Sequence, residues 1–121
     1  MENSESNFNK KLELNNIWIS YDDIGVGKTP ILFLHGFPFN KSMWKNQVDF
    51  LKDSYRIITL DIRSFGQSSN DGSELSMDVL ADDLIGFLNA LKLRQVIICG
   101  LSMGGFVALN AITRYPKRFA A

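Results

Sequence analysis

Hydrophobic and polar residues alternate in two short stretches near the start of the chain, residues 11–15 (KLELN) and residues 17–23 (IWISYDD). A period of two is typical of β-strands that bury one face, and the two asparagines between the stretches favour a tight turn. The pattern predicts an antiparallel hairpin at the edge of a sheet. The residues before it are polar, so we expect a disordered tail over residues 1–11 and one folded domain over residues 12–121.

Three continuous apolar runs follow the hairpin. They are ILFLHG (31–36), YRIITLD (55–61) and QVIICG (95–100). Runs without alternation are expected of strands that are buried on both faces of a parallel sheet.

Each run precedes a segment in which apolar residues recur at helical spacing. A first helix is expected to start near residues 40–42, and a second after Ser76, whose side chain is suited to cap it. A third helix is expected over residues 103–115, where Pro116 ends it. Strand and helix therefore alternate three times. This predicts an α/β fold, with a mostly parallel sheet that carries helices on both faces.

Composition narrows the class of partner. Of the 121 residues 45% are hydrophobic and 21% are charged, and 13 basic residues balance 13 acidic ones. Such a neutral chain favours neither nucleic acid nor a membrane surface as partner. No apolar run approaches the roughly 20 residues of a membrane span, and the polar start does not resemble a signal peptide, so we expect a cytoplasmic protein. The single cysteine, Cys99, is expected to be a small buried hydrophobe in a strand, and we expect no metal site.

The third run ends in glycines around one serine, GLSMGG at residues 100–105. Gly100 and Gly104 stand two residues before and after Ser102, where larger side chains would collide in a sharp turn from strand to helix. The residue at the tip of such a turn stands exposed at a helix amino terminus, whose amides and dipole favour negative charge. This place suits a nucleophilic hydroxyl, because attack on a carbonyl creates an oxyanion.

Three motifs in the chain resemble those of the α/β-hydrolase fold family, and they occur in the family's order. They are HGFP (35–38), DIRSFGQS (61–68) and GLSMGG (100–105). The resemblance implies the strand order 1-2-4-3-5-6 and the amino-terminal half of that fold, ending before strand six. The apolar run at residues 95–100 would then form an exposed sheet edge. The chain departs from the family at Ser64, where a glycine is usual.

The resemblance also implies roles for residues of these motifs. Ser102 would be the nucleophile, and the backbone amides of Phe37 and Met103 would form the oxyanion hole. The supporting residues would be His35, Gly36, Gly100 and Gly104. Four aromatic residues are candidates either for an acyl pocket or for ordinary packing: Phe37, Phe39, Trp44 and Phe65.

A serine hydroxyl needs a base to accept its proton and an acid to orient that base. The chain has one histidine, His35, which the resemblance places at a structural position of the oxyanion loop. In the family the acid and the histidine follow later strands. We therefore expect that this chain lacks both, is inactive alone, and is either part of a longer hydrolase or completed by a second chain.

The function that the resemblance favours is a serine hydrolase of small carboxylic esters or lactones. It would work through an acyl-enzyme, with no metal or cofactor. Relatives that open epoxides carry an aspartate in the place of Ser102, which favours the acyl-transfer branch here. Within that branch the motifs are closest to carboxylesterases and enol-lactonases, and C–C hydrolases and perhydrolases share them. The alternative is an inactive fragment or a non-catalytic binding module on the same fold.

Overall fold

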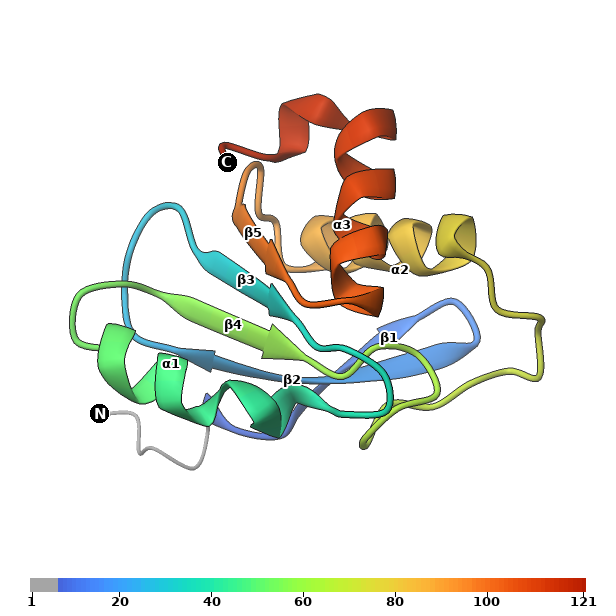
Figure 1. Cartoon of the computed structure of the whole chain (residues 1–121), viewed down its shortest axis with the longest axis horizontal. Coiled ribbons are helices and arrows are strands. Elements are labelled where there is room, and N and C mark those ends of the chain that lie inside the picture. Colours follow the sequence, from blue (N-terminus) through green and yellow to red (C-terminus); the bar gives the residue numbers. More distant parts are fainter. Residues whose placement is uncertain (1–6) are drawn as a thin grey trace.

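A mixed five-stranded sheet forms the centre of the protein, as a computed structural model of the chain shows for residues 7–121 (Figure 1). Its strand order is β1-β2-β4-β3-β5. The strands are β1 (Lys10–Leu14), β2 (Ile17–Ile24), β3 (Ile31–Leu34), β4 (Ile57–Leu60) and β5 (Ile97–Gly100). The three apolar runs supply the parallel strands β4, β3 and β5, and β2 joins them antiparallel. The predicted fold class is confirmed, and so is the predicted order of the first five strands.

The hairpin that precedes these strands is formed by β1 and β2, which pair antiparallel with Leu14 opposite Ile17. Strand β1 already begins at Lys10. Residues 10 and 11, which were expected in the disordered tail, are therefore part of the sheet, because they continue the alternation of β1 against β2. Residues 1–6 of that expected tail lie outside the described residues.

Helices cover both faces of the sheet (Figure 1). They are the 3-10 helix η2 (Lys41–Trp44), α1 (Lys45–Leu51), α2 (Met77–Ala90), α3 (Met103–Arg114) and the 3-10 helix η3 (Pro116–Arg118). Ser76 caps α2 as expected, since its side chain accepts a hydrogen bond from the amide of Val79. Asn40 caps η2 in the same way through the amide of Ser42. None of the helices among residues 7–121 combines the length and apolar character that a membrane crossing requires.

Two hydrophobic cores lie on opposite faces of the sheet. The larger core joins the sheet to α2 and α3, and within it the rings of Tyr21 and Phe87 meet edge to face at 5.0 Å. The smaller core joins the sheet to η2 and α1, where Trp44 lies 4.7 Å from Phe33. Strands with apolar residues on both faces are needed between two such cores, which explains the continuous apolar runs. Trp44 is therefore a core residue and not part of an acyl pocket.

Cys99 lies exposed on β5, so the expectation of a buried thiol is wrong. The residue pairs with Phe33 and faces the same side of the sheet, the side of the smaller core. That core takes residues from β2, β3 and β4 but none from β5, so nothing among residues 7–121 covers Cys99 from that side. Partial desolvation raises the pKa of the Cys99 thiol, which disfavours its reactive thiolate.

The outer edge of β5 is paired, contrary to the exposed edge expected from the sequence. Phe119 forms a parallel bridge with Val96, and the amide of Ile98 donates to the carbonyl of Ala121 at 3.0 Å. These last residues run where a sixth strand was expected. On the neighbouring helix α3, Phe106 and Leu109 remain 64% and 63% exposed.

Candidate active site

Ser102 forms the turn between β5 and α3. Its backbone has φ 52° and ψ −113°, a conformation that residues other than glycine rarely adopt. The residue is exposed. The amide of Gly104 donates to the carbonyl of Leu101 at 2.9 Å, and the amide of Phe106 donates to the carbonyl of Ser102 at 3.0 Å. The serine thus sits at the amino terminus of α3, at a sharp turn from strand to helix.

Steric contact explains the two glycines around this turn. A β-carbon on Gly104 would lie 2.3 Å from the carbonyl oxygen of Leu34, and one on Gly100 would lie 2.5 Å from the carbonyl oxygen of Gly104. Real β-carbons do not approach backbone atoms so closely. Gly105 is different, because its β-carbon would meet nothing closer than 3.5 Å. Gly100 and Gly104 therefore allow α3 to approach β3 and β5.

The loop after β3 lies directly against Ser102. A β-carbon on Gly36 would lie 3.4 Å from the β-carbon of Ser102 and 3.1 Å from the carbonyl oxygen of Leu101. The loop then turns back, with the amide of Phe39 donating to the carbonyl of Gly36 at 2.8 Å. Within residues 7–121, neither the amide of Phe37 nor that of Met103 donates a hydrogen bond to another protein group. The amide of Met103 is adjacent to Ser102 in sequence, and that of Phe37 follows Gly36, the residue whose added β-carbon would meet Ser102.

His35 precedes this loop and is completely buried. The amide of Ile62 donates to Nε2 of His35 at 2.9 Å, so Nε2 carries no proton, and Nδ1–H donates to the carbonyl of Gly36 at 3.0 Å. Burial lowers the pKa of His35, which keeps the ring neutral. Both nitrogens are occupied, so His35 ties the 36–39 loop to the end of β4 and has no free nitrogen for Ser102.

The neutral state of His35 predicts a loss of stability on mild acidification. The unfolded chain protonates its histidine at a pKa of about 6.5, whereas the folded chain does so only at lower pH, so the unfolded state binds more protons in between. The free energy of unfolding should therefore fall as the pH drops below about 6.5, by up to about 1.4 kcal/mol per pH unit. Urea unfolding at a series of pH values from 7 to 5 measures this slope.

His35→Gln is the control for that measurement, because it removes the titrating group. The variant should be less stable at pH 7 and should lack the slope assigned to the histidine. Asp22, whose pKa is raised by burial, acts in the opposite direction, because there the folded chain binds the extra proton. Both proteins keep Asp22, so its contribution cancels in the comparison. Equal slopes in the two proteins would contradict the assignment.

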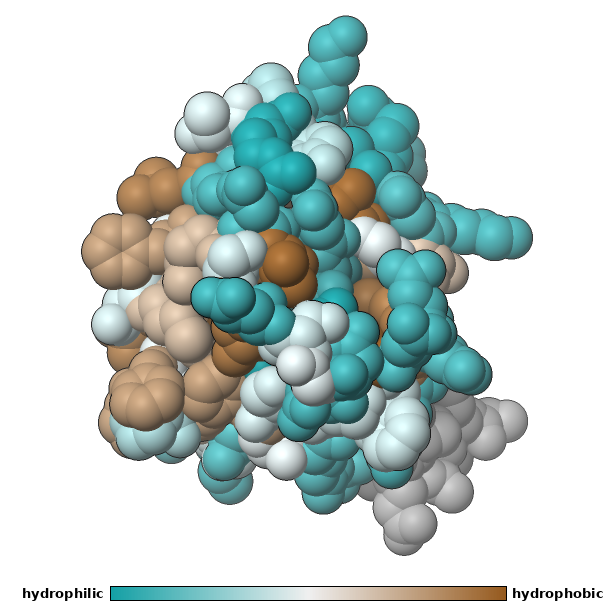
Figure 2. Space-filling model, turned by 90° about the vertical axis from the view of Figure 1, so that its right-hand side faces the viewer, coloured by the Kyte–Doolittle hydropathy of each residue, from teal (hydrophilic) through white to brown (hydrophobic). Residues whose placement is uncertain are grey.

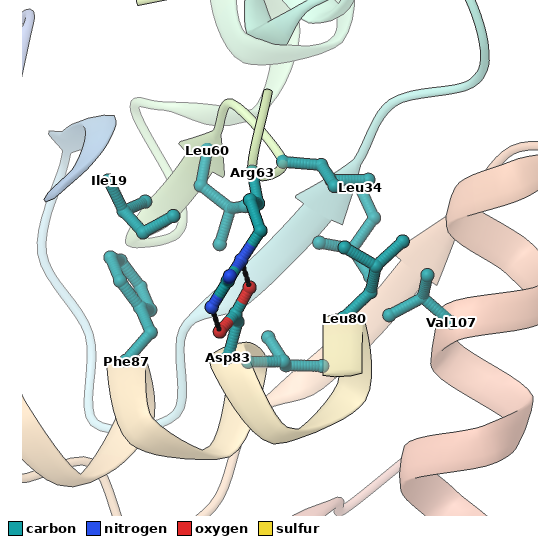
Figure 3. A pocket seen from close by; sticks show the side chains of 10 residues that line it. Ile19, Leu34, Leu60, Arg63, Leu80, Asp83, Phe87 and Val107 are labelled. Atoms are coloured by element: carbon teal, nitrogen blue, oxygen red, sulfur yellow. Dashed lines mark hydrogen bonds and ion pairs between the residues drawn. The ribbon is translucent and has the colours of Figure 1, made fainter. Parts of the chain in front are cut away.

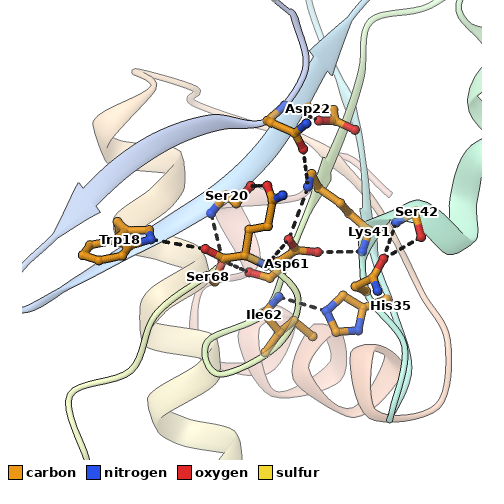
Figure 4. A network of polar contacts seen from close by, with 12 residues as sticks. Trp18, Ser20, Asp22, His35, Lys41, Ser42, Asp61, Ile62 and Ser68 are labelled. Carbon is orange, nitrogen blue, oxygen red and sulfur yellow. Dashed lines mark hydrogen bonds and ion pairs between the residues drawn. The ribbon is translucent and has the colours of Figure 1, made fainter.

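The carboxylate of Asp61 organises the loop that follows β4 (Figure 4). It accepts hydrogen bonds from the amides of Lys41 at 2.7 Å and Gln67 at 2.9 Å, and it forms a buried ion pair with the Lys41 ammonium at 3.3 Å. Gly66 is required here, because a β-carbon on it would lie 2.3 Å from the carboxyl carbon of Asp61. Residues 61–68 are therefore a structural support for the neighbouring 36–39 loop.

Two serines of the same loop have different local roles. The hydroxyl of Ser68 donates to the carbonyl of Asp61 at 2.6 Å and accepts from the amide of Ser20 at 2.8 Å, which ties the loop to β2. Ser64, in contrast, has φ 77°. This is the left-handed conformation that favours glycine. Serine in the place of the family's usual glycine therefore keeps the turn, but with a strained backbone.

Arg63 ties the loop to α2 at a small cavity (Figure 3). Its guanidinium forms two hydrogen bonds with Asp83, at 2.8 and 2.7 Å, and an ion pair with Asp71 at 3.1 Å. The hydrogen bonds to Asp83 raise the pKa of Arg63 further. Apart from this pair the cavity is lined by apolar side chains of the larger core, and it shares no lining residue with the groove beside Ser102. We assign it a structural role.

An open apolar groove lies beside Ser102, along α3 and β5. It is lined by Ile98, Gly100, Ser102, Gly105, Phe106, Ala108, Leu109, Ile112 and Ala121. Figure 2 shows apolar side chains gathered along one side of the molecule. No titratable side chain lines the groove, and the described residues contain no cluster of three or more His, Cys, Asp or Glu that is placed to hold a metal ion.

The structure thus brings Ser102, Gly36, Gly100 and Gly104 together, and the amide of Met103 follows Ser102 directly in the chain. Two contacts were not foreseen. Nothing in the sequence indicated the buried ion pair between Lys41 and Asp61, because Lys41 lies in a polar stretch. The ring of Phe65 packs between His35 and Phe37, which the aromatic spacing alone did not indicate.

Comparisons with known proteins agree with this geometry. The family model described as alpha/beta hydrolase fold matches residues 29–121. The AB hydrolase superfamily protein YisY of Bacillus subtilis is 39% identical over 78% of this chain and 35% of its own length. The 3-oxoadipate enol-lactonase 2 of Acinetobacter baylyi is 31% identical over 93% of this chain and 42% of its own.

Among solved structures, a thermophilic esterase from Thermogutta terrifontis superposes with a TM-score of 0.82 at 41% identity, over 86% of this chain and 38% of the esterase. The chain therefore spans less than half the length of the relatives that it matches. The family model covers the three parallel strands, the turn at Ser102 and the loops beside it, and on this ground the chain belongs to the alpha/beta hydrolase fold family.

Proposed function

We propose that Ser102 is the nucleophile of a serine hydrolase that cleaves small carboxylic esters or lactones. The observation that carries the proposal is the strained turn at Ser102, which exposes the serine at the amino terminus of α3, so close to Gly36 that a β-carbon there would meet the Ser102 side chain. Relatives named as an enol-lactonase and an esterase support this substrate class. The exposed free thiol of Cys99 is compatible with the reducing cytoplasm, where we place the enzyme.

The reaction would proceed in two steps. The Ser102 oxygen attacks the ester carbonyl while a base takes the hydroxyl proton, and the amides of Phe37 and Met103 donate hydrogen bonds to the resulting oxyanion. The C–O bond of the alcohol then breaks and the alcohol leaves with the proton, which forms the acyl-enzyme. Water attacks the acyl carbon in the second step, which releases the acid and restores Ser102. No metal or cofactor takes part.

The base and the acid that orients it would come from outside residues 1–121. His35 is the one histidine of the chain, and both of its nitrogens are engaged. We call the complete form the protein that adds these groups to residues 1–121, either from residues that follow codon 121 in the gene or from a second chain. Reading the coding sequence beyond codon 121 distinguishes the two sources.

Labelling with a fluorophosphonate tests the nucleophile. In the complete form the probe should modify Ser102, and mass spectrometry of the peptide that contains residues 100–105 should locate the adduct. Ser102→Ala should abolish the label, whereas Ser73→Ala, which changes an exposed loop serine, should leave it unchanged. A complete form that carries an acid and a histidine and still resists the probe would favour a non-catalytic binding module.

A further inference from the structure

Three aromatic rings contact one another in a row, from buried His35 after β3, through Phe65, to exposed Phe37. The ring of Phe65 lies 5.5 Å from that of His35, at 68°, and 5.8 Å from that of Phe37, at 89°. Both contacts are edge to face, the arrangement that the charge distribution of aromatic rings favours. His35 is completely buried and Phe37 is 67% exposed. The row of rings therefore leads from a completely buried ring to an exposed one.

Phe65 itself is held by its own backbone. Its amide donates to the carbonyl of Ile62 at 2.8 Å, and its carbonyl accepts from the amide of Ser68 at 3.0 Å. Its side chain packs against the larger core. The amide of Phe37 provides no comparable restraint, because it donates no hydrogen bond to another group within residues 7–121. The aromatic contact therefore restrains Phe37, the freer of the two residues.

The restrained residue is the one that matters for the proposed reaction. Phe37 follows Gly36, where an added β-carbon would lie 3.4 Å from that of Ser102, and its amide is one of the two donors proposed for the oxyanion. A donor stabilises an oxyanion only when it is held at hydrogen-bond distance from it. We propose that Phe65 is a positioning residue for ester hydrolysis, which holds the amide and ring of Phe37 beside Ser102; this role rests on the function proposed above.

Kinetics of the complete form test the role with p-nitrophenyl acetate. Phe65→Leu should lower kcat about tenfold with little change in KM, because an aromatic pair is worth about 2- to 13-fold and the loss of one oxyanion donor about 10²- to 10³-fold. Phe65→Tyr keeps the ring and should restore kcat. Phe50→Leu is the matched control, because Phe50 is 85% exposed on α1. Once Phe37 is leucine, Phe65→Leu should change kcat less than about twofold, since the pair is already broken.

A second measurement does not depend on activity. In the 121-residue chain labelled with ¹⁵N, Phe65→Leu should shift the amide signal of Phe37, whereas Phe65→Tyr and Phe50→Leu should not. An unmoved Phe37 amide, or an equal loss of kcat with and without the Phe37 ring, would overturn the role of Phe65 while activity still depends on Ser102. Activity that Ser102→Ala does not reduce would instead overturn the proposed function, and the role with it.

Discussion

The 121-residue chain alone is expected to hydrolyse p-nitrophenyl acetate about 10⁶-fold more slowly than the complete form, which corresponds to about 8 kcal/mol of activation free energy. A loss of this size follows removal of the base from a serine protease. The physical reason here is the state of His35, whose two nitrogens are bonded to Ile62 and Gly36. No side chain that lines the groove beside Ser102 is titratable. The initial rate of p-nitrophenol release by each form, at equal concentration and at pH 7, measures the ratio.

Ser102→Ala in both forms is the control. It should remove the activity of the complete form and leave the background of the short chain unchanged. If the short chain matches the complete form and loses its activity with Ser102→Ala, a group within residues 1–121 is the base. The assignment of His35 as a purely structural residue would then be wrong.

Gly104→Ala is expected to destabilise the chain by at least about 3 kcal/mol. The added β-carbon would lie 2.3 Å from the carbonyl oxygen of Leu34 and 2.7 Å from that of His35, both of them backbone atoms of β3 and its end. Relief of this clash would require α3 to move away from the sheet, which opens the larger core around Val107 and Ala108. Strained insertions into packed interiors cost about 1–3 kcal/mol or more. Urea unfolding followed by circular dichroism measures the difference.

The adjacent Gly105→Ala provides the matched control. Its β-carbon would find ordinary van der Waals distance, 3.5 Å or more, and alanine is about 1 kcal/mol better than glycine inside a helix. The control should therefore be neutral or slightly more stable than the wild-type chain. Equal effects of the two substitutions would show that helix propensity, and not the contact with β3, decides the tolerance at this turn.

The elements of the fold were predictable because their signals are local. Alternation marked the hairpin, continuous apolar runs marked the strands between two cores, and Ser76 marked the start of α2. The spacing of Gly100, Ser102 and Gly104 likewise predicted a sharp turn, since the steric demand lies within five residues. The order of the strands required the resemblance to a family, because pairing between distant segments leaves no local pattern.

What the sequence did not reveal depends on contacts between distant segments. An apolar run does not show whether its strand is covered on both sides, which is why Cys99 was expected to be buried. The contact of Phe65 with Phe37 joins positions that are far apart in the chain, and aromatic residues have the same pattern in a core and at a site. Lys41 is buried against Asp61 although its neighbours are polar. Each outcome is decided by tertiary packing.

The backbone conformation of Ser102 lowers the stability of the fold, whereas its hydroxyl serves the proposed activity. A residue other than glycine at φ 52° carries conformational strain of roughly 1–3 kcal/mol. Glycine would adopt the same turn without that strain, so selection for stability alone would replace the serine. If Ser102 is the nucleophile proposed above, its hydroxyl comes at the expense of a more stable fold, which is the trade-off expected of a residue that serves chemistry. A screen for stabilised variants of this protein should therefore also measure labelling of Ser102 by a fluorophosphonate. Selection for stability alone would favour variants in which glycine replaces the serine.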